Sequence, residues 1–249
     1  MYQRTDDWFK ARLGCVTASR ISSVLSKGVS RDKYIEQLVL ERSTGRRQEK
    51  QFTNAAIEHG INTEPLARRA YEKEKRLTVT EIAFVLHPRI KYAGASPDGF
   101  VGIKGLLEIK CPNTRTHNHT LEKDVVRSEY IKQMQWQMAC TGREWCDFVS
   151  YDDRDDAIQK LYIKRIKRDE SLIRYLEEAV ALLLAEVDNR TERLMASKPM
   201  IKAATGHQNT EQTPSLRHQA ENEGGSYKNW ILIWLALVIV AGFLKIVMR

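Results

Sequence analysis

Cysteine is scarce in this chain, and the few cysteines lack the spacing that cysteine-based metal sites need. Four are present among 249 residues. No two of them are separated by two residues, and no histidine stands two to four residues from any of them. This pattern argues against a structural zinc site of the cysteine type, an iron–sulfur cluster or a disulfide scaffold. We expect the thiols to behave as small apolar side chains in a reducing cytosol: Cys15, Cys111, Cys140 and Cys146.

An apolar run is also missing from the N-terminus, where the sequence reads MYQRTDDW, so we expect no signal peptide. The chain as a whole does not lack apolar residues. It is 42% apolar and 29% charged, which excludes wholesale disorder and collagen-like sequence. Its length suggests one large domain or two small ones. The 40 lysines and arginines exceed the 32 aspartates and glutamates by 8, so we expect an anionic partner, either nucleic acid or anionic lipid.

A long apolar run lies at the other end of the chain. Fifteen residues from position 230 onward (WILIWLALVIVAGFL) carry no polar side chain, and Lys245 can snorkel to the bilayer surface. We predict a transmembrane helix over 230–248, with a buried core helix or an oligomer contact as the alternative. The polar stretch 196–229 predicts a flexible linker. Residues 1–195 should therefore form the folded domain, which the membrane helix would hold on the cytoplasmic side.

Within that domain the hydrophobic patterns predict an α/β fold. Helical spacing indicates helices over 6–12, 17–25, 32–42, 53–75, 130–140 and 170–195, the fourth with a kink or restart at Pro65. Alternating or β-branched runs indicate strands over 77–86, 90–95, 106–110, 147–151 and 160–165, with a turn region around a short strand at 99–105. This order predicts a mixed central β-sheet flanked by helices.

The stretch from Asp98 to Lys110 carries the pattern that points to chemistry. Side chains two residues apart on a strand share a face, so Glu108 and Lys110 should project together while Ile109 faces the buried side. If the glycine-rich segment before them folds as a hairpin, Asp98 returns beside Glu108. Two carboxylates so close need a cation, and hard oxygen ligands favour Mg²⁺ or Mn²⁺. Such a group can promote attack of water on a phosphodiester, with Lys110 orienting the water or stabilising the developing charge.

This trio alone is a weak signal, because exposed strand residues of unrelated proteins match it too. Four blocks in order are more specific: WFKARLGCVTAS (8–19), HGINTEPLARRAYE (59–72), ASPDGFV with GLLEIKCP (95–112) and YIKQMQWQMACTGREWCDFVSYD (130–152). In these blocks the chain resembles the lambda-exonuclease-like (YqaJ-type) viral recombinase family of the PD-(D/E)XK nuclease superfamily.

The resemblance implies a restriction-endonuclease-like fold and a Mg²⁺-dependent exonuclease. Such an enzyme digests one strand of linear double-stranded DNA from 5′ to 3′ and leaves a 3′ single strand for phage-type recombination. The resemblance also implies a homotrimer around DNA and a single-strand annealing protein as partner.

Carried over by position, the resemblance assigns roles to residues of this chain. The metal ligands would be Asp98, Glu108, Glu64 and the carbonyl of Ile109, and the catalytic lysine would be Lys110. The residues that hold the 5′-phosphate and the scissile strand would be Arg12, Ser19, Ser96 and Gln135. Each of these has a plainer alternative, such as a surface salt bridge, a turn or cap bond, or a solvated helix face.

Alternatives remain open at this stage. An endonuclease of the same fold would cut closed circular DNA, which an enzyme that needs ends would leave intact. A membrane-tethered DNA-binding protein with an inactive core is a third possibility, although the complete trio speaks against it. We expect His117 and His119 to be surface residues in a polar loop. The alternating stretch Lys160–Arg168 predicts either a basic face along phosphates or an edge strand protected by lysine.

Overall fold

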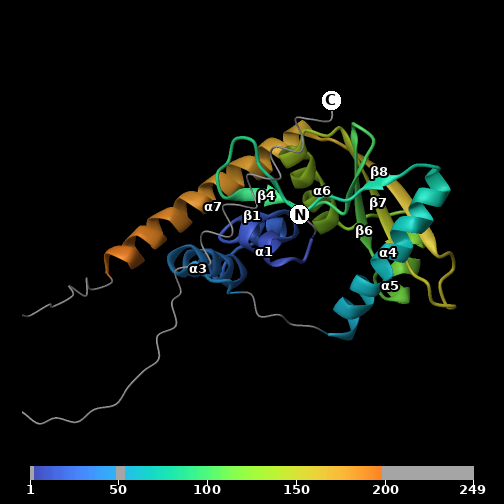
Figure 1. Ribbon diagram of the computed structural model, residues 1–249, viewed down its shortest axis with the longest axis horizontal. Helices are drawn as coiled ribbons and strands as arrows, with labels where there is room; N and C mark the ends of the chain where they lie inside the picture. The colour runs from blue at the N-terminus through green and yellow to red at the C-terminus, as the bar shows by residue number, and fades with distance from the viewer. Residues whose placement is uncertain (1–2, 49–53, 198–249) are drawn as a thin grey trace, which may run out of the picture. The chain divides into compact units, whose positions relative to one another are not determined.

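The computed structural model describes residues 3–48 and 54–197 (Figure 1). The chain divides into two units, 1–200 and 201–249, and the described residues all lie in the first. The predicted transmembrane helix over 230–248 and nearly all of the predicted linker lie outside the described residues. None of the helices in the described ranges is both long enough and apolar enough to cross a bilayer.

Two β-sheets with helices around them make up the described part of the chain. The helices are α1 (Asp6–Arg12), α2 (Ile21–Leu25), α3 (Val29–Thr44), α4 (Ala55–Lys75), α5 (Thr114–Lys123), α6 (Ser128–Thr141) and α7 (Glu170–Ala196), with a short 3-10 helix over Ala18–Arg20. The strands are β1 (Val16–Thr17), β2 (Val79–Thr80), β3 (Val85–Leu86), β4 (Ala93–Ala95), β5 (Gly99–Val101), β6 (Gly105–Lys110), β7 (Trp145–Tyr151) and β8 (Leu161–Lys167).

The larger sheet has the strand order β2-β5-β6-β7-β8, and the smaller one has the order β1-β4-β3. In the larger sheet β6 and β7 are parallel, while the other neighbours are antiparallel. In the smaller sheet β1 runs parallel to β4 and β3 runs antiparallel to it. The mixed α/β fold with flanking helices is therefore confirmed, but the predicted single sheet is divided in two.

Strand β6 is buried on both faces, and this determines where its polar side chains point. Leu106 belongs to an apolar cluster with α6 and α7, whereas Leu107 and Ile109 pack with Ala67 and Tyr71 of α4. Figure 1 shows α4 on one side of β6 and β7 and α6 on the other. Each buried leucine or isoleucine contributes about 1.5–3 kcal/mol, so the register of β6 is strongly specified. Residues on the same face as Leu106 therefore point toward α6.

The predicted strand over 77–86 is wrong, because only its two ends pair and they join different sheets. The peptide groups between them bond to side chains from the N-terminus instead. The Ile82 carbonyl accepts a hydrogen bond from Gln3 Nε2 at 2.8 Å, and the Ala83 carbonyl accepts one from Trp8 Nε1 at 3.1 Å. A tertiary contact thus takes the backbone groups that a continuous strand would have used.

Several helix boundaries also differ from the prediction. The stretch predicted as a helix over 17–25 starts as strand β1, and α2 begins only at Ile21. Helix α4 is one element that contains Pro65, so the predicted restart does not occur. Its first turn is capped by the Asn54 side chain, which accepts a hydrogen bond from the Ile57 N–H at 2.9 Å.

Helix α5 lies in a stretch where a loop was expected, and one prediction fails there. Asn113 caps its first turn by accepting a hydrogen bond from the Thr116 N–H at 2.9 Å. His117 on this helix is fully buried, with Nδ1 2.7 Å from Ser150 Oγ and Nε2 2.6 Å from the Gln159 carbonyl oxygen. The expected surface position is therefore wrong for His117, whereas His119 is exposed.

The basic stretch after residue 160 forms β8, an edge strand of the larger sheet. Two of its cations are paired with acids. Lys164 Nζ is 2.7 Å from Asp124 Oδ2, and Arg165 Nε is 2.8 Å from Asp147 Oδ1. These pairs favour the edge-strand interpretation over a face that follows phosphates.

Candidate active site

A hairpin brings the two predicted metal-binding acids together. Strands β5 and β6 are antiparallel, with Gly99 opposite Leu107. The Asp98 N–H donates to the Leu107 carbonyl at 3.1 Å, and the Asp98 carboxylate accepts from the Ile109 N–H at 2.6 Å. Asp98 therefore sits at the end of the hairpin beside Glu108, as the sequence predicts.

Glu108 is held by three donors and is only 1% exposed. Its Oε1 accepts from Lys110 Nζ at 2.5 Å and from Gln133 Nε2 at 2.6 Å. Its Oε2 accepts from Gln137 Nε2 at 2.6 Å. The two amides stand four residues apart on α6, so they share the helix face that packs against β6. A buried carboxylate with these donors has a single orientation, which is what a metal ligand or catalytic acid requires.

Glu64 approaches the same group from α4. Its Oε1 accepts from Arg68 Nη2 at 2.8 Å, and its Oε2 accepts from Arg4 Nη2 at 3.0 Å. Arg68 Nη2 also donates to the backbone carbonyl of Asp98 at 3.2 Å. A pocket of about 190 Å³ lies at this point, lined by Gln3, Arg4, Glu64, Pro65, Arg68, Glu81 and Asp98.

The electrostatics of the group show that the charge of the Asp98 carboxylate is not fully compensated. Burial raises the pKa of Asp98 well above its usual value, and the charges of Glu108 and Glu64 raise it further. The Lys110 ammonium and the Ile109 N–H act in the opposite direction but do not cancel this effect. For Lys110, burial alone would lower the pKa, but the charges of Glu108 and Asp98 outweigh it and raise the pKa. Lys110 is thus a cation at neutral pH.

These residues fit a hard divalent ion. Asp98, Glu108 and Glu64 offer carboxylate oxygens, which Mg²⁺ and Mn²⁺ prefer as ligands. Burial and the charges of Glu108 and Glu64 raise the pKa of Asp98 more than Lys110 lowers it, and a bound cation would offset that remaining cost of ionisation. The carbonyl of Ile109, in the strand between Glu108 and Lys110, is the fourth oxygen that the family resemblance implies.

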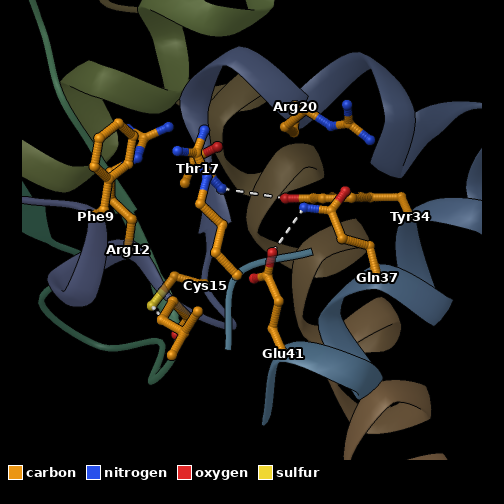
Figure 2. Close-up of a pocket in the computed structure, with 10 residues that line it drawn as sticks. Phe9, Arg12, Cys15, Thr17, Arg20, Tyr34, Gln37 and Glu41 are labelled. Atoms are coloured by element: carbon orange, nitrogen blue, oxygen red, sulfur yellow. Dashed lines mark hydrogen bonds between the residues drawn. The ribbon is translucent and has the colours of Figure 1, made fainter. Parts of the chain in front are cut away.

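A second pocket, of about 30 Å³, lies between the α1–β1 segment and α3. Figure 2 shows Arg12 and Thr17 on one side of it and Tyr34 and Glu41 of α3 on the other. Three arginines and one glutamate give it a positive balance, so it suits a small anion. Its lining residues are Phe9, Arg12, Leu13, Cys15, Thr17, Arg20, Tyr34, Gln37, Glu41 and Arg47.

Arg12 connects this basic pocket to the acidic group. Its guanidinium lies 4.0 Å from the centre of the Trp8 ring, and its Nη1 donates to Ser96 Oγ at 3.2 Å. Ser96 also accepts from Trp8 Nε1 at 2.9 Å, and it stands two residues before Asp98. The structure thus brings the predicted pair Arg12 and Ser96 together, next to the predicted metal ligands.

Ser19 and Gln135, the other two residues expected to hold the DNA, lie in different parts of the structure. Ser19 is exposed beside the basic pocket, with its Oγ 3.5 Å from Thr17 Oγ1. Gln135, which the resemblance places at the DNA strand, makes its hydrogen bonds outside the acidic group. It is 2% exposed, its Nε2 donates to the Lys167 carbonyl at 2.8 Å, and its Oε1 accepts from the Asp169 N–H at 2.9 Å. Gln135 points away from β6, because residues two apart on a helix lie on different faces.

Sequence reasoning missed the roles of several side chains around the acids. Gln133 and Gln137 hold Glu108, and their spacing of four residues on a predicted helix was the available signal. Arg68 stands four residues after Glu64 on α4, which is the same kind of signal. Arg4 had none, because its contact with Glu64 joins two segments far apart in the sequence.

The chain is similar to known proteins in sequence and in fold. Residues 7–144 match the family model described as a YqaJ-like viral recombinase domain. The crystal structure of an alkaline exonuclease (LHK-Exo) from Laribacter hongkongensis is similar, with a TM-score of 0.72 and 49% identity, covering 77% of this chain and 97% of that one. Its complex with dAMP has a TM-score of 0.73 at the same identity and coverage.

Two further relatives are more distant in sequence. A phage-related exonuclease from Haemophilus somnus 129PT has the same fold, with a TM-score of 0.56 at 13% identity, covering 74% of this chain and 96% of that one. The uncharacterized protein R354 of Acanthamoeba polyphaga mimivirus is 28% identical over 175 residues, which are 63% of this chain. The chain spans 31% of the length of that curated relative.

The family model covers more than half of the 249 residues, and it includes α1 except its first residue, the hairpin with both acids and all of α6. The chain therefore belongs to the family with a YqaJ-like viral recombinase domain, a lambda-exonuclease-like group within the PD-(D/E)XK superfamily.

Proposed function

We propose that this protein is a metal-dependent deoxyribonuclease that digests linear double-stranded DNA from its 5′ ends. The observation that carries the proposal is the convergence of Asp98, Glu108 and Lys110 beside a small arginine-lined pocket, with Arg12 and Ser96 linking the two. The similarity to an alkaline exonuclease at 49% identity supports it.

The chemistry follows from the charges of the chain's own residues. A bound divalent ion supplies positive charge to the attacked phosphate and lowers the pKa of the attacking water. Lys110 has a raised pKa and stays protonated, so it donates hydrogen bonds and stabilises negative charge rather than accepting a proton. Gln133 and Gln137 keep the Glu108 carboxylate oriented while the substrate binds.

The small size of the basic pocket favours DNA ends over internal sites. A pocket of about 30 Å³ suits a terminal group but not a continuing strand. Guanidinium groups bind phosphate through paired hydrogen bonds, and Arg12, Arg20 and Arg47 line this pocket. We therefore propose that it receives the 5′-phosphate, with Ser19 and Ser96 near the strand. The complex of the similar exonuclease with dAMP supports a nucleotide site in this fold.

The remaining parts of the proposal come from the family resemblance. We propose Mg²⁺ as the working ion with Mn²⁺ as a substitute, a homotrimer in solution, and a single-strand annealing protein that receives the 3′ overhang. Sedimentation with and without DNA tests the trimer independently of cleavage.

The activity is tested with linear and closed circular duplex DNA, with 5′-phosphate or 5′-hydroxyl ends, in Mg²⁺ or chelator. We expect digestion of linear DNA only, faster from 5′-phosphate ends, with release of mononucleotides and no reaction in chelator. Nicking or linearisation of the circle would instead indicate an endonuclease of the same fold.

Replacing Lys110 by alanine should abolish cleavage without abolishing DNA binding. The ammonium stabilises charge that develops during the reaction, so its loss should lower kcat by about 10²–10³-fold. Lys104→Ala removes an exposed lysine from the same hairpin and is the matched control. Normal cleavage by Lys110→Ala would contradict the role given to this residue.

Gln133→Ala removes a hydrogen-bond donor that orients Glu108. We expect it to lower the activity, and to raise the Mg²⁺ concentration needed for half-maximal rate, each by about 10–100-fold. Gln135→Ala should lower thermal stability but leave the Mg²⁺ requirement unchanged, since its amide bonds only to backbone. A raised Mg²⁺ requirement in Gln135→Ala but not in Gln133→Ala would contradict the positions given to these two glutamines.

Asp98→Asn should stabilise the metal-free protein at neutral pH. The pKa of Asp98 is raised by folding, so the stability of the protonated form is present at acidic pH and is lost as the pH rises through the folded pKa. Asparagine carries no charge, so the variant does not lose this stability as the pH rises. Its side-chain oxygen can still accept a hydrogen bond from the Ile109 N–H. Asp98→Asn should therefore melt at a higher temperature than the wild type in chelator, and this difference in melting temperature should increase from acidic to neutral pH.

Asp155→Asn, at an exposed position, is the control for this measurement. Its melting temperature should differ from that of the wild type by the same amount at acidic and neutral pH. Adding Mg²⁺ should raise the melting temperature of the wild type more than that of Asp98→Asn. A wild type that is the more stable protein at neutral pH in chelator would contradict the charge repulsion described above.

A further inference from the structure

A second group of potential metal ligands lies where the first half of α4 meets the end of β7. It consists of His59, Asp152 and Asp153, whose ligand atoms all lie within 4.8 Å of one another. None of these residues belongs to the group formed by Asp98, Glu108 and Glu64. The cluster is more than a set of exposed acids, because it includes an imidazole and because Asp152 is completely buried.

His59 presents one nitrogen to this cluster. Its Nδ1 lies 3.4 Å from the hydroxyl of Thr63, one turn further along α4. Its Nε2 is buried and has no hydrogen-bond partner. If Nδ1 carries the proton and donates it to Thr63, the lone pair on Nε2 is available to a metal ion. Metal-bound histidines commonly have this arrangement, in which an oxygen acceptor fixes the ring.

Asp152 also has an unused acceptor. Its Oδ1 accepts from Arg154 Nε at 2.6 Å and from the Arg154 N–H at 3.2 Å. Its Oδ2 is buried and meets no donor at hydrogen-bond geometry, although Arg154 and the Thr114 side chain together hold the pKa of Asp152 below its usual value despite its burial. A buried polar atom without a partner costs about 1–3 kcal/mol, so it needs an explanation. Two such acceptors, the Nε2 of His59 and the Oδ2 of Asp152, belong to one cluster of ligand atoms.

We propose that His59, Asp152 and Asp153 bind a second divalent ion, a transition metal of the Zn²⁺ class, apart from the catalytic ion. One imidazole nitrogen and two carboxylate oxygens form a set that Zn²⁺ uses, whereas Mg²⁺ prefers oxygen ligands alone. Arg154 orients Asp152 as hydrogen-bond donors orient ligating carboxylates elsewhere. This inference does not rest on the proposed nuclease activity.

The position of the ion suggests what it would do for the protein. It would join α4, which carries Glu64, to the end of β7, which pairs with the strand that carries Glu108. Cys111, the neighbour of Lys110, lies close enough to both groups of acids for their charges to act on its thiol. Its pKa is raised to about 12, first by burial and then by the charges of Glu64, Asp98, Asp153 and Asp152. The ion would therefore fix α4 against the sheet close to the active site.

The test is a calorimetric titration of the full-length chain with Zn²⁺. Metal is first stripped with chelator, the chelator is removed, and excess Mg²⁺ is added to fill the catalytic acids. The variants that remove ligands are His59→Gln and Asp153→Asn, both at half-buried positions. His119→Gln, at an exposed position, is the matched histidine control, and Asp98→Asn removes a catalytic ligand.

We expect the wild type, His119→Gln and Asp98→Asn to bind one Zn²⁺ tightly, and His59→Gln and Asp153→Asn to bind it at least about tenfold more weakly. Zn²⁺ should raise the melting temperature of the wild type but not of His59→Gln. Melting curves in chelator check that each variant is folded. Equal Zn²⁺ affinity in wild type and His59→Gln, or loss of the tight site in Asp98→Asn alone, would overturn the proposal.

Discussion

The hydrogen bond from the Ile109 N–H to the Asp98 carboxylate, 2.6 Å long, is the contact on which the site depends. It closes the β5–β6 hairpin at the point where β6 carries Glu108 and Lys110. Together with the bond from the Asp98 N–H to the Leu107 carbonyl, it holds the Asp98 carboxylate beside Glu108. The bond from Ile109 favours the ionised carboxylate, although burial and two neighbouring acids raise the pKa of Asp98 despite it.

The group is assembled by elements that come from opposite faces of the sheet. Gln133 and Gln137 approach from α6, and Glu64 approaches from α4 together with Arg68. The apolar residues of β6 alternate between these two layers, so the sheet places its polar side chains at the junction of both. This double packing holds three carboxylates close together, an arrangement that suits the binding of a cation.

Much of the fold could be predicted because its signals are local. The helices that begin at Asp6 and Glu170 follow from helical spacing and good first-turn residues, and strand β6 follows from its apolar run. The segment 77–86 could not be predicted correctly, because Gln3 and Trp8 take its carbonyl groups from far away in the sequence. Burial of His117 likewise depends on partners that only the folded chain supplies.

By itself, the sequence determined the shared face of Glu108 and Lys110, because alternation along a strand is a local property. Its glycines also favoured the hairpin that the structure contains, and its four ordered blocks indicated the family. Only the tertiary structure decided which glutamines of α6 meet Glu108, that Arg4 reaches Glu64, and that His59 stands beside Asp152. Those contacts join residues far apart along the chain, and their geometry depends on how α4 and α6 pack against the sheet, which no local pattern encodes.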